Sequence, residues 1–258
     1  MTGLGAFADL AERLADAVRP VVLGHFRHGA DYEVKPDASP VTIADREVET
    51  ILRRMIEEEH PDHGILGEEH GAKNLGAPFV WVLDPIDGTK SFVTGKPLFG
   101  TLIALLHEGR PVVGVIDMPA LSERWVGVEG RPTLRDGRAA RTRACGDLSR
   151  AWIYATSPHM FTGEDHDRYE RLRSRCYTSL YGADLYAYGL LASGTVDLVC
   201  EAQTKPYDYC ALVPVVIGAG GVITDWQGRP LGLASDGRVL AAGDARMHAA
   251  ARATLAGA

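Results

Sequence analysis

An apolar run that ends in two carboxylates constrains this chain more than any other feature. The run from Pro78 to Leu83 is long enough for a buried strand and too short for a typical helix. It is expected to end at Asp84, because Pro85 cannot donate a hydrogen bond to a sheet. Asp87 and the pair Gly88-Thr89 follow. A strand that ends in two acids and a Gly-Thr turn can hold hard cations on one side and a phosphate on the other.

Composition narrows the class of protein. The 258 residues are 46% hydrophobic and 24% charged, which allows one large domain or two lobes with a sizeable core. A net charge of −7 disfavours non-specific attraction to nucleic acid or to anionic membranes. No apolar run approaches the roughly 18 residues that span a bilayer, and the N-terminus lacks the basic region of a signal peptide. The four cysteines show no metal-ligand spacing, so we expect reduced thiols in a cytoplasmic protein.

Two helices are expected before the central run. Apolar residues recur at helical spacing from Leu4 to about Phe26, and Pro20 predicts a kink or an early end. Pro36 is expected to keep the following segment extended. Thr42 then opens a helix that reaches about residue 59, with Asp45 at the spacing of a capping box.

An antiparallel sheet is expected around the central run. Residues 64–70 form a short strand that leads into Glu68 and Glu69, whose side chains point to opposite sides if the chain is extended. Residues 99–106 and 110–116 predict a hairpin, and residues 121–128 begin a third strand. The region up to residue 143 continues as strands and Gly-containing turns.

The character of the chain shifts near residue 146, and we place a lobe boundary there, between residues 1–146 and 147–258. The second lobe alternates strands with helices, and residues 176–201 indicate a strand–helix–strand unit with parallel strands. Pro206 suits a helix start, and Asp208 falls in the first turn, where the helix dipole favours a carboxylate. Pro214 predicts a local kink in that helix. A strand at 239–242 and an Ala-rich helix close the chain.

These motifs together resemble the signature of the inositol monophosphatase superfamily, the lithium-sensitive, Mg²⁺-dependent phosphatases of small molecules. The resemblance rests on Asp84-Pro-Ile-Asp-Gly-Thr89, on the Lys35…Val-Thr-x-x-Asp45 segment, and on Tyr207-Asp208 followed by Ala219-Gly-Gly221. It covers the chain from Lys35 to the end. It implies an α+β fold, a layered αβαβα sandwich with a largely antiparallel N-terminal sheet and a smaller mixed C-terminal α/β lobe. It also implies a homodimer.

The resemblance implies a set of metal ligands made of oxygen alone. The implied ligands are Glu68, Asp84, the backbone carbonyl of Ile86, Asp87 and Asp208, with Asp45 serving a weakly held third ion. Several acids that converge on one point repel one another unless cations lie among them. Oxygen ligation favours two or three Mg²⁺ ions, with Mn²⁺ as a possible substitute. Li⁺ and Ca²⁺ are expected to inhibit.

The implied reaction is hydrolysis of a phosphate monoester by water. Glu68 and Thr89 would orient and deprotonate the water, with Asp45 as a further catalytic residue. The amides of Gly88 and Thr89 would hold the phosphate in line for attack. Lys90 either stabilises an anion or is merely exposed, and Glu69 is either a supporting acid or a solvated one.

Substrate choice depends on the second lobe. The sequence after Thr89 and the stretch 186–193 look most like the histidinol-phosphate phosphatase branch. Asp184 and Glu201 could meet the ammonium and imidazole of L-histidinol phosphate, and the resemblance adds Gly182, Asp87 and Asp208 to the substrate-binding set. Alternatively, Asp184 caps the helix that follows it and Glu201 is an ordinary strand-end acid. Arg168 to Arg175 could attract anions, although a solvated helix face balanced by nearby acids is the simpler interpretation.

Three other functions stay open. Two are sibling activities, on inositol 1-phosphate or on 3′-phosphoadenosine 5′-phosphate. The third belongs to another class, a non-catalytic regulatory protein that binds metal or phosphate. Loss of a ligand would indicate that third function, and no implied ligand is lost.

Overall fold

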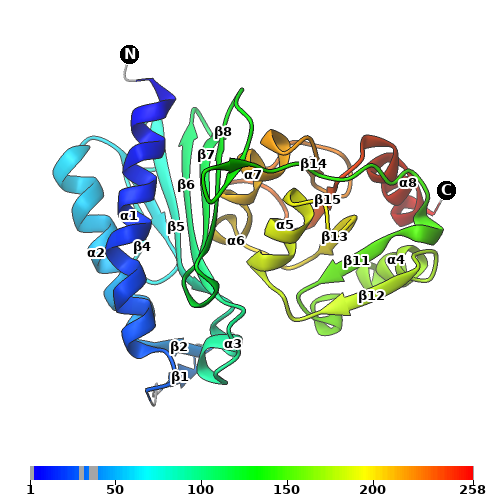
Figure 1. Cartoon of the computed structure of the whole chain (residues 1–258), viewed down its shortest axis with the longest axis horizontal. Coiled ribbons are helices and arrows are strands. Elements are labelled where there is room, and N and C mark those ends of the chain that lie inside the picture. Colours follow the sequence, from blue (N-terminus) through cyan, green and yellow to red (C-terminus); the bar gives the residue numbers. More distant parts are fainter. Residues whose placement is uncertain (1–2, 29–31, 35–39, 258) are drawn as a thin grey trace.

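The fold is a stack of five layers, as the resemblance implies. The computed structural model describes residues 3–28, 32–34 and 40–257, so the extended segment expected at Pro36 lies outside the described residues. Figure 1 shows a helical layer, a large sheet, a second helical layer, a smaller sheet and a third helical layer in succession. The α+β class and the αβαβα order are therefore confirmed.

The large sheet is largely antiparallel. Its strand order is β10-β9-β8-β7-β6-β5-β3-β4, and only the β3–β5 pair is parallel among the described strands. The strands are β3 (Gly64–Gly67), β4 (Gly71–Lys73), β5 (Phe79–Asp87), β6 (Gly100–His107), β7 (Arg110–Met118), β8 (Glu123–Val128), β9 (Leu134–Arg135) and β10 (Arg138–Ala139). The expected hairpin at 99–116 is β6–β7.

The small sheet is mixed. Its order is β12-β11-β13-β15-β14, where the first three strands run parallel and the last two antiparallel to their neighbours. The strands are β11 (Trp152–Ala155), β12 (Thr178–Tyr181), β13 (Leu198–Glu201), β14 (Val222–Thr224) and β15 (Val239–Ala242). The expected strand–helix–strand unit is confirmed as β12–α5–β13, although β11 lies between its two strands.

The helices cover both sheets. Helices α1 (Leu4–His25) and α2 (Ile43–Glu59) form the first layer, α5 (Leu185–Ala192), α6 (Pro206–Tyr209) and α7 (Leu212–Gly218) lie between the sheets, and α4 (Glu164–Arg173) and α8 (Ala245–Ala256) form the last layer. The remaining elements are α3 (Thr89–Val93), the small β1–β2 pair (Tyr32–Val34 and Pro40–Thr42) and three 3₁₀ turns (Pro119–Leu121, Leu148–Arg150 and Pro158–Met160).

Pro20 does not end α1, so the expected early end is wrong. The helix continues to His25, and Val18 and Val22 on either side of the proline are fully buried. Pro20 itself is exposed. Water can therefore reach the carbonyl that loses its hydrogen bond, while the apolar face keeps the helix on the sheet.

The strand that carries the two acids runs further than expected. β5 includes Pro85 and ends at Asp87, with an irregularity in its pairing with β6 between Asp84 and Asp87. Pro85 is tolerated there because residues at a bulge are not required to donate a backbone hydrogen bond to the neighbouring strand. The hydroxyl of Thr101 donates to the Pro85 carbonyl at 2.8 Å and holds the bulge against β6.

The helix expected after Pro206 is divided in two, so the predicted kink at Pro214 is wrong. α6 ends at Tyr209 and α7 begins at Leu212, which puts Pro214 in the first turn of α7. The first turn needs no backbone donor, so a proline there costs no helical hydrogen bond.

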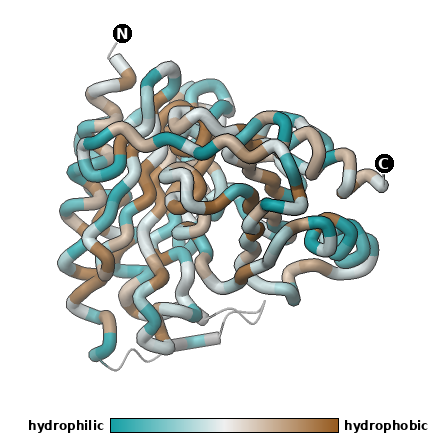
Figure 2. The backbone as a smooth tube through the Cα atoms, turned by 45° about the vertical axis from the view of Figure 1, so that its right-hand side comes forward, coloured by the Kyte–Doolittle hydropathy of each residue, from teal (hydrophilic) through white to brown (hydrophobic). Residues whose placement is uncertain are grey.

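One buried cluster of side chains joins the two sheets. It combines Val82 and Leu102 of the large sheet, Val199 and Ala241 of the small sheet, and the helices between them. Figure 2 shows brown, hydrophobic stretches along the strands and teal, hydrophilic ones on outer loops. The division at residues 146 and 147 stays a prediction, because this shared core lies across it.

Candidate active site

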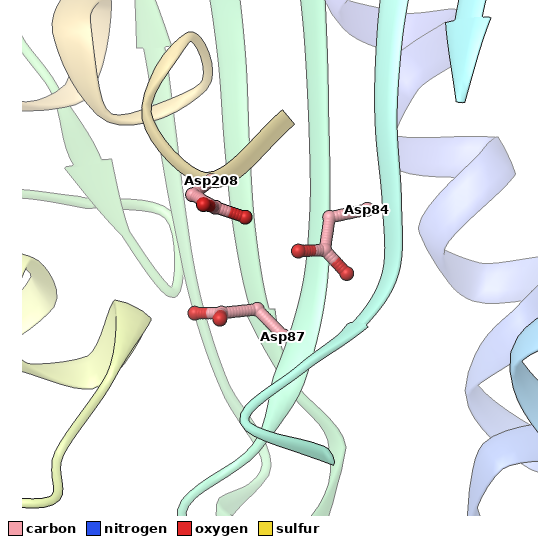
Figure 3. A group of neighbouring side chains, drawn as sticks. All are labelled: Asp84, Asp87 and Asp208. Carbon is pink, nitrogen blue, oxygen red and sulfur yellow. The ribbon is translucent and has the colours of Figure 1, made fainter. Parts of the chain in front are cut away.

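Three aspartates meet where β5 ends. Asp84 and Asp87 lie on β5, and Asp208 lies on α6. One carboxylate oxygen from each lies within 4.8 Å of the others. Figure 3 shows the three side chains pointing into a common space. Residues more than 120 positions apart in the sequence are thus assembled into one acidic group.

Backbone amides fix two of these carboxylates. Asp87 accepts a hydrogen bond from the amide of Leu185 at 2.7 Å, at the start of α5. Asp208 accepts one from the amide of Lys205 at 2.7 Å, at the start of α6. The helix starts of the middle layer therefore orient acids from both halves of the site.

Burial and mutual repulsion dominate the electrostatics of this group. Burial, and then the charges of Glu68 and Asp87, raise the pKa of Asp84 well above its ordinary value. Burial and the neighbouring acids Asp184 and Asp208 do the same to the pKa of Asp87. Burial raises the pKa of Asp208 to about 7. These carboxylates become ionised together only when a cation compensates them.

One buried oxygen identifies where a cation fits. Asp84 is 1% exposed, and its Oδ1 atom has no hydrogen-bond partner among the described residues. A buried carboxylate oxygen without a donor is costly unless a metal ion or another ligand takes that place. The donor set is made of oxygen, which suits Mg²⁺ or Mn²⁺ better than zinc.

Glu68 and Asp45 lie around this group without belonging to it. Glu68 lines the adjoining cavity, and its charge raises the pKa of both Asp84 and Asp208. Asp45 is buried and accepts hydrogen bonds from the amide (2.8 Å) and the hydroxyl (2.6 Å) of Thr42. The predicted capping box is therefore present. Burial raises the pKa of Asp45 to about 6, and the charges of Glu69 and Glu68 add to that rise.

The turn after Asp87 depends on a glycine. Gly88 has φ 83°, and a Cβ atom there would lie 2.8 Å from the Leu98 carbonyl oxygen, so only glycine fits. Thr89 begins α3, and its hydroxyl donates to the Ile86 carbonyl at 3.0 Å. The bond leaves lone pairs on both oxygens, so each can still take part in ligand binding.

A cavity of about 400 Å³ opens beside the acids. Its lining includes Asp184 and Glu201 from the second half of the chain, together with Glu68, Asp87, Thr89 and Asp208. Lys90 lines it as well. The structure thus brings together the acids that the sequence suggested for metal and for substrate.

Asp184 and Glu201 have different surroundings. Glu201 accepts hydrogen bonds from the amide (3.1 Å) and the hydroxyl (2.6 Å) of Thr156 and from the hydroxyl of Tyr188 (2.8 Å). The carboxylate of Asp184 accepts none from the described residues and does not cap α5, and the residue adopts φ 47°. Capping by the Asp184 side chain is therefore wrong. Burial, and then the charge of Glu201, raise the pKa of Asp184 to about 7, against the opposing charges of Lys96 and Lys90.

Gly182 stands apart from the lining. Its carbonyl accepts a hydrogen bond from the Lys96 ammonium, and its φ of 76° turns the chain toward Asp184. The basic cluster on α4 does not line the cavity either. Arg168 and Arg173 pair with acids of their own helix, which fits a solvated helix face.

Sequence reasoning missed Thr156 and Tyr188. Both bind Glu201, from 45 and 13 positions away. Tyr188 lies in the stretch 186–193, which gave it no role of its own. Thr156 belongs to no motif, and only the pairing of β11 with β13 brings it to the site.

No helix in the described part of the chain is both long and apolar enough to cross a membrane.

Comparisons with known proteins agree with this geometry. The chain is 50% identical to the bifunctional phosphatase IMPL2, chloroplastic, of Arabidopsis thaliana, over 98% of this chain and 76% of that protein. It is 37% identical to a histidinol-phosphatase of Mycobacterium tuberculosis, over 85% and 88% of the two chains. A solved inositol monophosphatase from Zymomonas mobilis matches with a TM-score of 0.91 and 44% identity, over 99% and 100% of the two chains. The model of the inositol monophosphatase family matches residues 5–257, and the chain therefore belongs to that family.

Proposed function

We propose that this protein is a Mg²⁺-dependent phosphatase that converts L-histidinol phosphate to L-histidinol in histidine biosynthesis. The observation that carries the proposal is the unpartnered, buried Oδ1 of Asp84 among three converging aspartates. Family membership supports phosphatase chemistry on small phosphate monoesters. The substrate within that class is argued from Asp184 and Glu201.

The described residues fit two or three Mg²⁺ ions. Asp84, Asp87 and Asp208 would hold them, with Glu68 and the Ile86 carbonyl as further ligands and Asp45 beside a third ion. When bound, Mg²⁺ supplies charge that activates water and stabilises the leaving oxygen.

The chain's own groups orient the reactants. The Thr89 hydroxyl donates to Ile86, so its oxygen can accept a hydrogen bond from the attacking water. Glu68 lines the same cavity and can accept the water's proton. The amides of Gly88 and Thr89 would hold the phosphate, in a turn that glycine alone permits.

The substrate body is expected to be cationic. Asp184 is a cavity carboxylate to which no described residue donates, while Glu201 already accepts three hydrogen bonds. Asp184 would therefore bind the ammonium or imidazole directly, and Glu201 would mainly hold Thr156 and Tyr188 in place. Asp87, Asp208 and Gly182 complete the predicted substrate contacts. The M. tuberculosis relative that carries the name histidinol-phosphatase supports this choice.

Inositol 1-phosphatase activity is the second candidate, because the similar solved structure is that of an inositol monophosphatase. The substrate 3′-phosphoadenosine 5′-phosphate would need basic groups for a second phosphate, and the lysines that line the cavity, Lys90 and Lys205, lie among several acids. A purely regulatory protein is less well supported, because every implied ligand is retained.

Three finer properties belong to the same proposal. We infer a homodimer by resemblance to the family, and a cytoplasmic location from the composition of the chain. The lobes 1–146 and 147–258 would contribute the β5 acids and Asp208, respectively.

The first test is phosphate release from L-histidinol phosphate, inositol 1-phosphate and 3′-phosphoadenosine 5′-phosphate, with Mg²⁺ and after EDTA. We expect kcat/KM to be at least about tenfold higher for histidinol phosphate, about 1.4 kcal/mol in transition-state binding. If another substrate is preferred, the proposed metal site stands and the substrate assignment is overturned. No Mg²⁺-dependent release from any of the three by the folded protein would overturn the proposed substrate and favour a binding protein.

A substitution at Asp184 tests the substrate contact. Asp184→Asn keeps the size of the side chain and removes its charge, so kcat/KM for histidinol phosphate should fall about tenfold. The value for inositol 1-phosphate should stay within about twofold. Asp167→Asn, on the exposed face of α4, serves as the matched control. An equal loss for both substrates would contradict a role in recognising the cation.

A further inference from the structure

A further buried carboxylate, that of Glu49, lies on α2. Glu49 is 0% exposed. Its oxygens accept hydrogen bonds from the backbone amides of Glu69 (2.6 Å) and His70 (3.1 Å). Arg53, one turn further along the helix, pairs with it at 2.7 Å. Glu49 therefore binds the chain directly after Glu68.

The carboxylate of Glu49 leaves no room for a side chain at the neighbouring Gly67. A Cβ atom on Gly67 would lie 2.0 Å from Glu49 Oε1, closer than real atoms approach. Gly67 is also buried at the end of β3. The absence of a side chain at residue 67 is thus what lets Glu49 reach the amides that follow Glu68.

Glu68 is held between two anchors. Its own amide donates to the Leu83 carbonyl at 3.2 Å, next to Asp84 on β5. The amides of the next two residues donate to Glu49 on α2. Asp45 lies one turn before Glu49 on the same helix. The backbone of Glu68 is therefore fixed relative to β5, which carries Asp84 and Asp87, and to α2, which carries Asp45.

We propose that Glu49 is a positioning residue that holds Glu68 in the geometry needed to bind Mg²⁺. The inference rests on the proposed function, because it assumes that Glu68 is a metal ligand. Glu49 does not line the cavity, so it would act through the backbone of residues 68–70 and not by contact with the ion. Groups that orient metal ligands in this way commonly change metal affinity by about 10- to 100-fold when they are replaced.

The charge of Glu49 matters because both amides donate to one carboxylate. A carboxylate accepts shorter and stronger amide hydrogen bonds than a neutral group. Arg53 compensates that buried charge, and its guanidinium also donates to the Gly71 carbonyl beyond the turn. The pair therefore ties both ends of the turn to α2.

The test is isothermal titration calorimetry with Mg²⁺ on the full chain and on Glu49→Gln. Glutamine keeps the size of the side chain but offers a single acceptor oxygen to two amides. We expect the Mg²⁺ dissociation constant to rise about tenfold or more. Glu58→Gln, at an exposed pair on the same helix, should leave it unchanged. Activity of Glu49→Gln should recover when Mg²⁺ is raised to saturation.

The outcomes separate this inference from the proposed function. If the unaltered chain neither binds Mg²⁺ nor releases phosphate, the proposed function fails. If the unaltered chain does both and Glu49→Gln binds Mg²⁺ equally well, the positioning role is overturned, even if its unfolding temperature falls. If Glu49→Gln does not fold, Gly67→Ala takes its place, because the added methyl displaces the Glu49 carboxylate without removing it. Unchanged Mg²⁺ affinity in that variant also overturns the inference.

Discussion

Asp197 and Asp84 are each 1% exposed, but their surroundings are opposite. Asp197, just before β13, receives two bonds from Arg143 at 2.7 and 2.6 Å and one from the amide of Trp152 at 2.8 Å. Burial raises the pKa of Asp197, but these bonds outweigh it and leave the pKa below its ordinary value. Asp84 is surrounded by other acids, and its pKa is raised.

The difference separates acids that serve the fold from acids that serve a ligand. An acid buried for stability finds its cation within the chain, because an uncompensated buried charge is costly. Asp84 Oδ1 has no such partner among the described residues, so we expect its compensating charge to come from a bound cation. Substituting each kind of acid, and adding or removing Mg²⁺, tests this difference.

The largest effect is expected at Asp84. Asp84→Asn removes one negative charge from a proposed metal ligand, so kcat/KM should fall by about 10³-fold, about 4 kcal/mol of transition-state stabilisation. Without Mg²⁺, the variant should be at least as stable to urea as the unaltered chain, because repulsion among the acids decreases. If the variant keeps its activity, or is strongly destabilised without metal, Asp84 is not an acid that serves a ligand.

The same change at Asp197 should have the reverse result. Asp197→Asn leaves Arg143 without its carboxylate, and the free energy of unfolding should fall by about 3 kcal/mol. Asp197 lies at the opposite end of β13 from Glu201, so kcat/KM per folded molecule should stay unchanged. Urea denaturation and steady-state kinetics on one preparation measure both. Loss of activity without loss of stability would show that the two kinds of acid are not distinct.

Added Mg²⁺ should stabilise the chain itself. At about 100 times its dissociation constant, an ion that binds only the folded state adds about 2.7 kcal/mol to the free energy of unfolding. Thermal unfolding with EDTA and with Mg²⁺ measures the shift. Asp84→Asn should lose most of it and Asp197→Asn should keep it. An equal shift in both variants would place the metal elsewhere.

His248 is a buried base to which no described acid is paired, and it extends the comparison. Burial, and then the nearby charge of Arg252, lower the pKa of His248 to about 4. The unfolded chain takes up this proton near pH 6.5, so stability is lost as pH falls from about 7 to 5, by about 2 kcal/mol. His248→Gln should reduce that loss, because the other titrating groups are unchanged. His166→Gln, at an exposed position, is the control, and an equal pH dependence in all three proteins would contradict the assignment.

Much of the fold could be predicted because local patterns agreed with the tertiary structure. The helix from Ile43 to Glu59 follows from its capping box and apolar stripe, and the β6–β7 hairpin follows from two apolar runs and a short turn. The prolines gave the errors. Pro20, Pro85 and Pro214 are each tolerated for a reason that depends on exposure, on a bulge or on where a helix starts, and none of these is a property of the local sequence.

The candidate site was predicted only in part for the same reason. Asp84, Asp87 and Asp208 lie in motifs that could be found by reading along the chain. Glu49 and Thr156 act through contacts with residues 20 and 45 positions away, and nothing next to them in the sequence indicates it. The sequence also suggests Asp184, but only the three-dimensional structure shows that no described residue donates to its carboxylate, in contrast to Glu201.

The hydrophobic cluster between the two sheets has a consequence for how this chain can be divided. Its side chains come from both sheets and from the helices between them, so neither half can bury its own inner face alone. Cutting the chain between the sheets would expose that face on both fragments and favour their aggregation. The three aspartates of the proposed metal site come from both halves, so we expect that site to exist only in a unit that folds and unfolds cooperatively. A functional piece of this protein smaller than the five-layer stack is not expected.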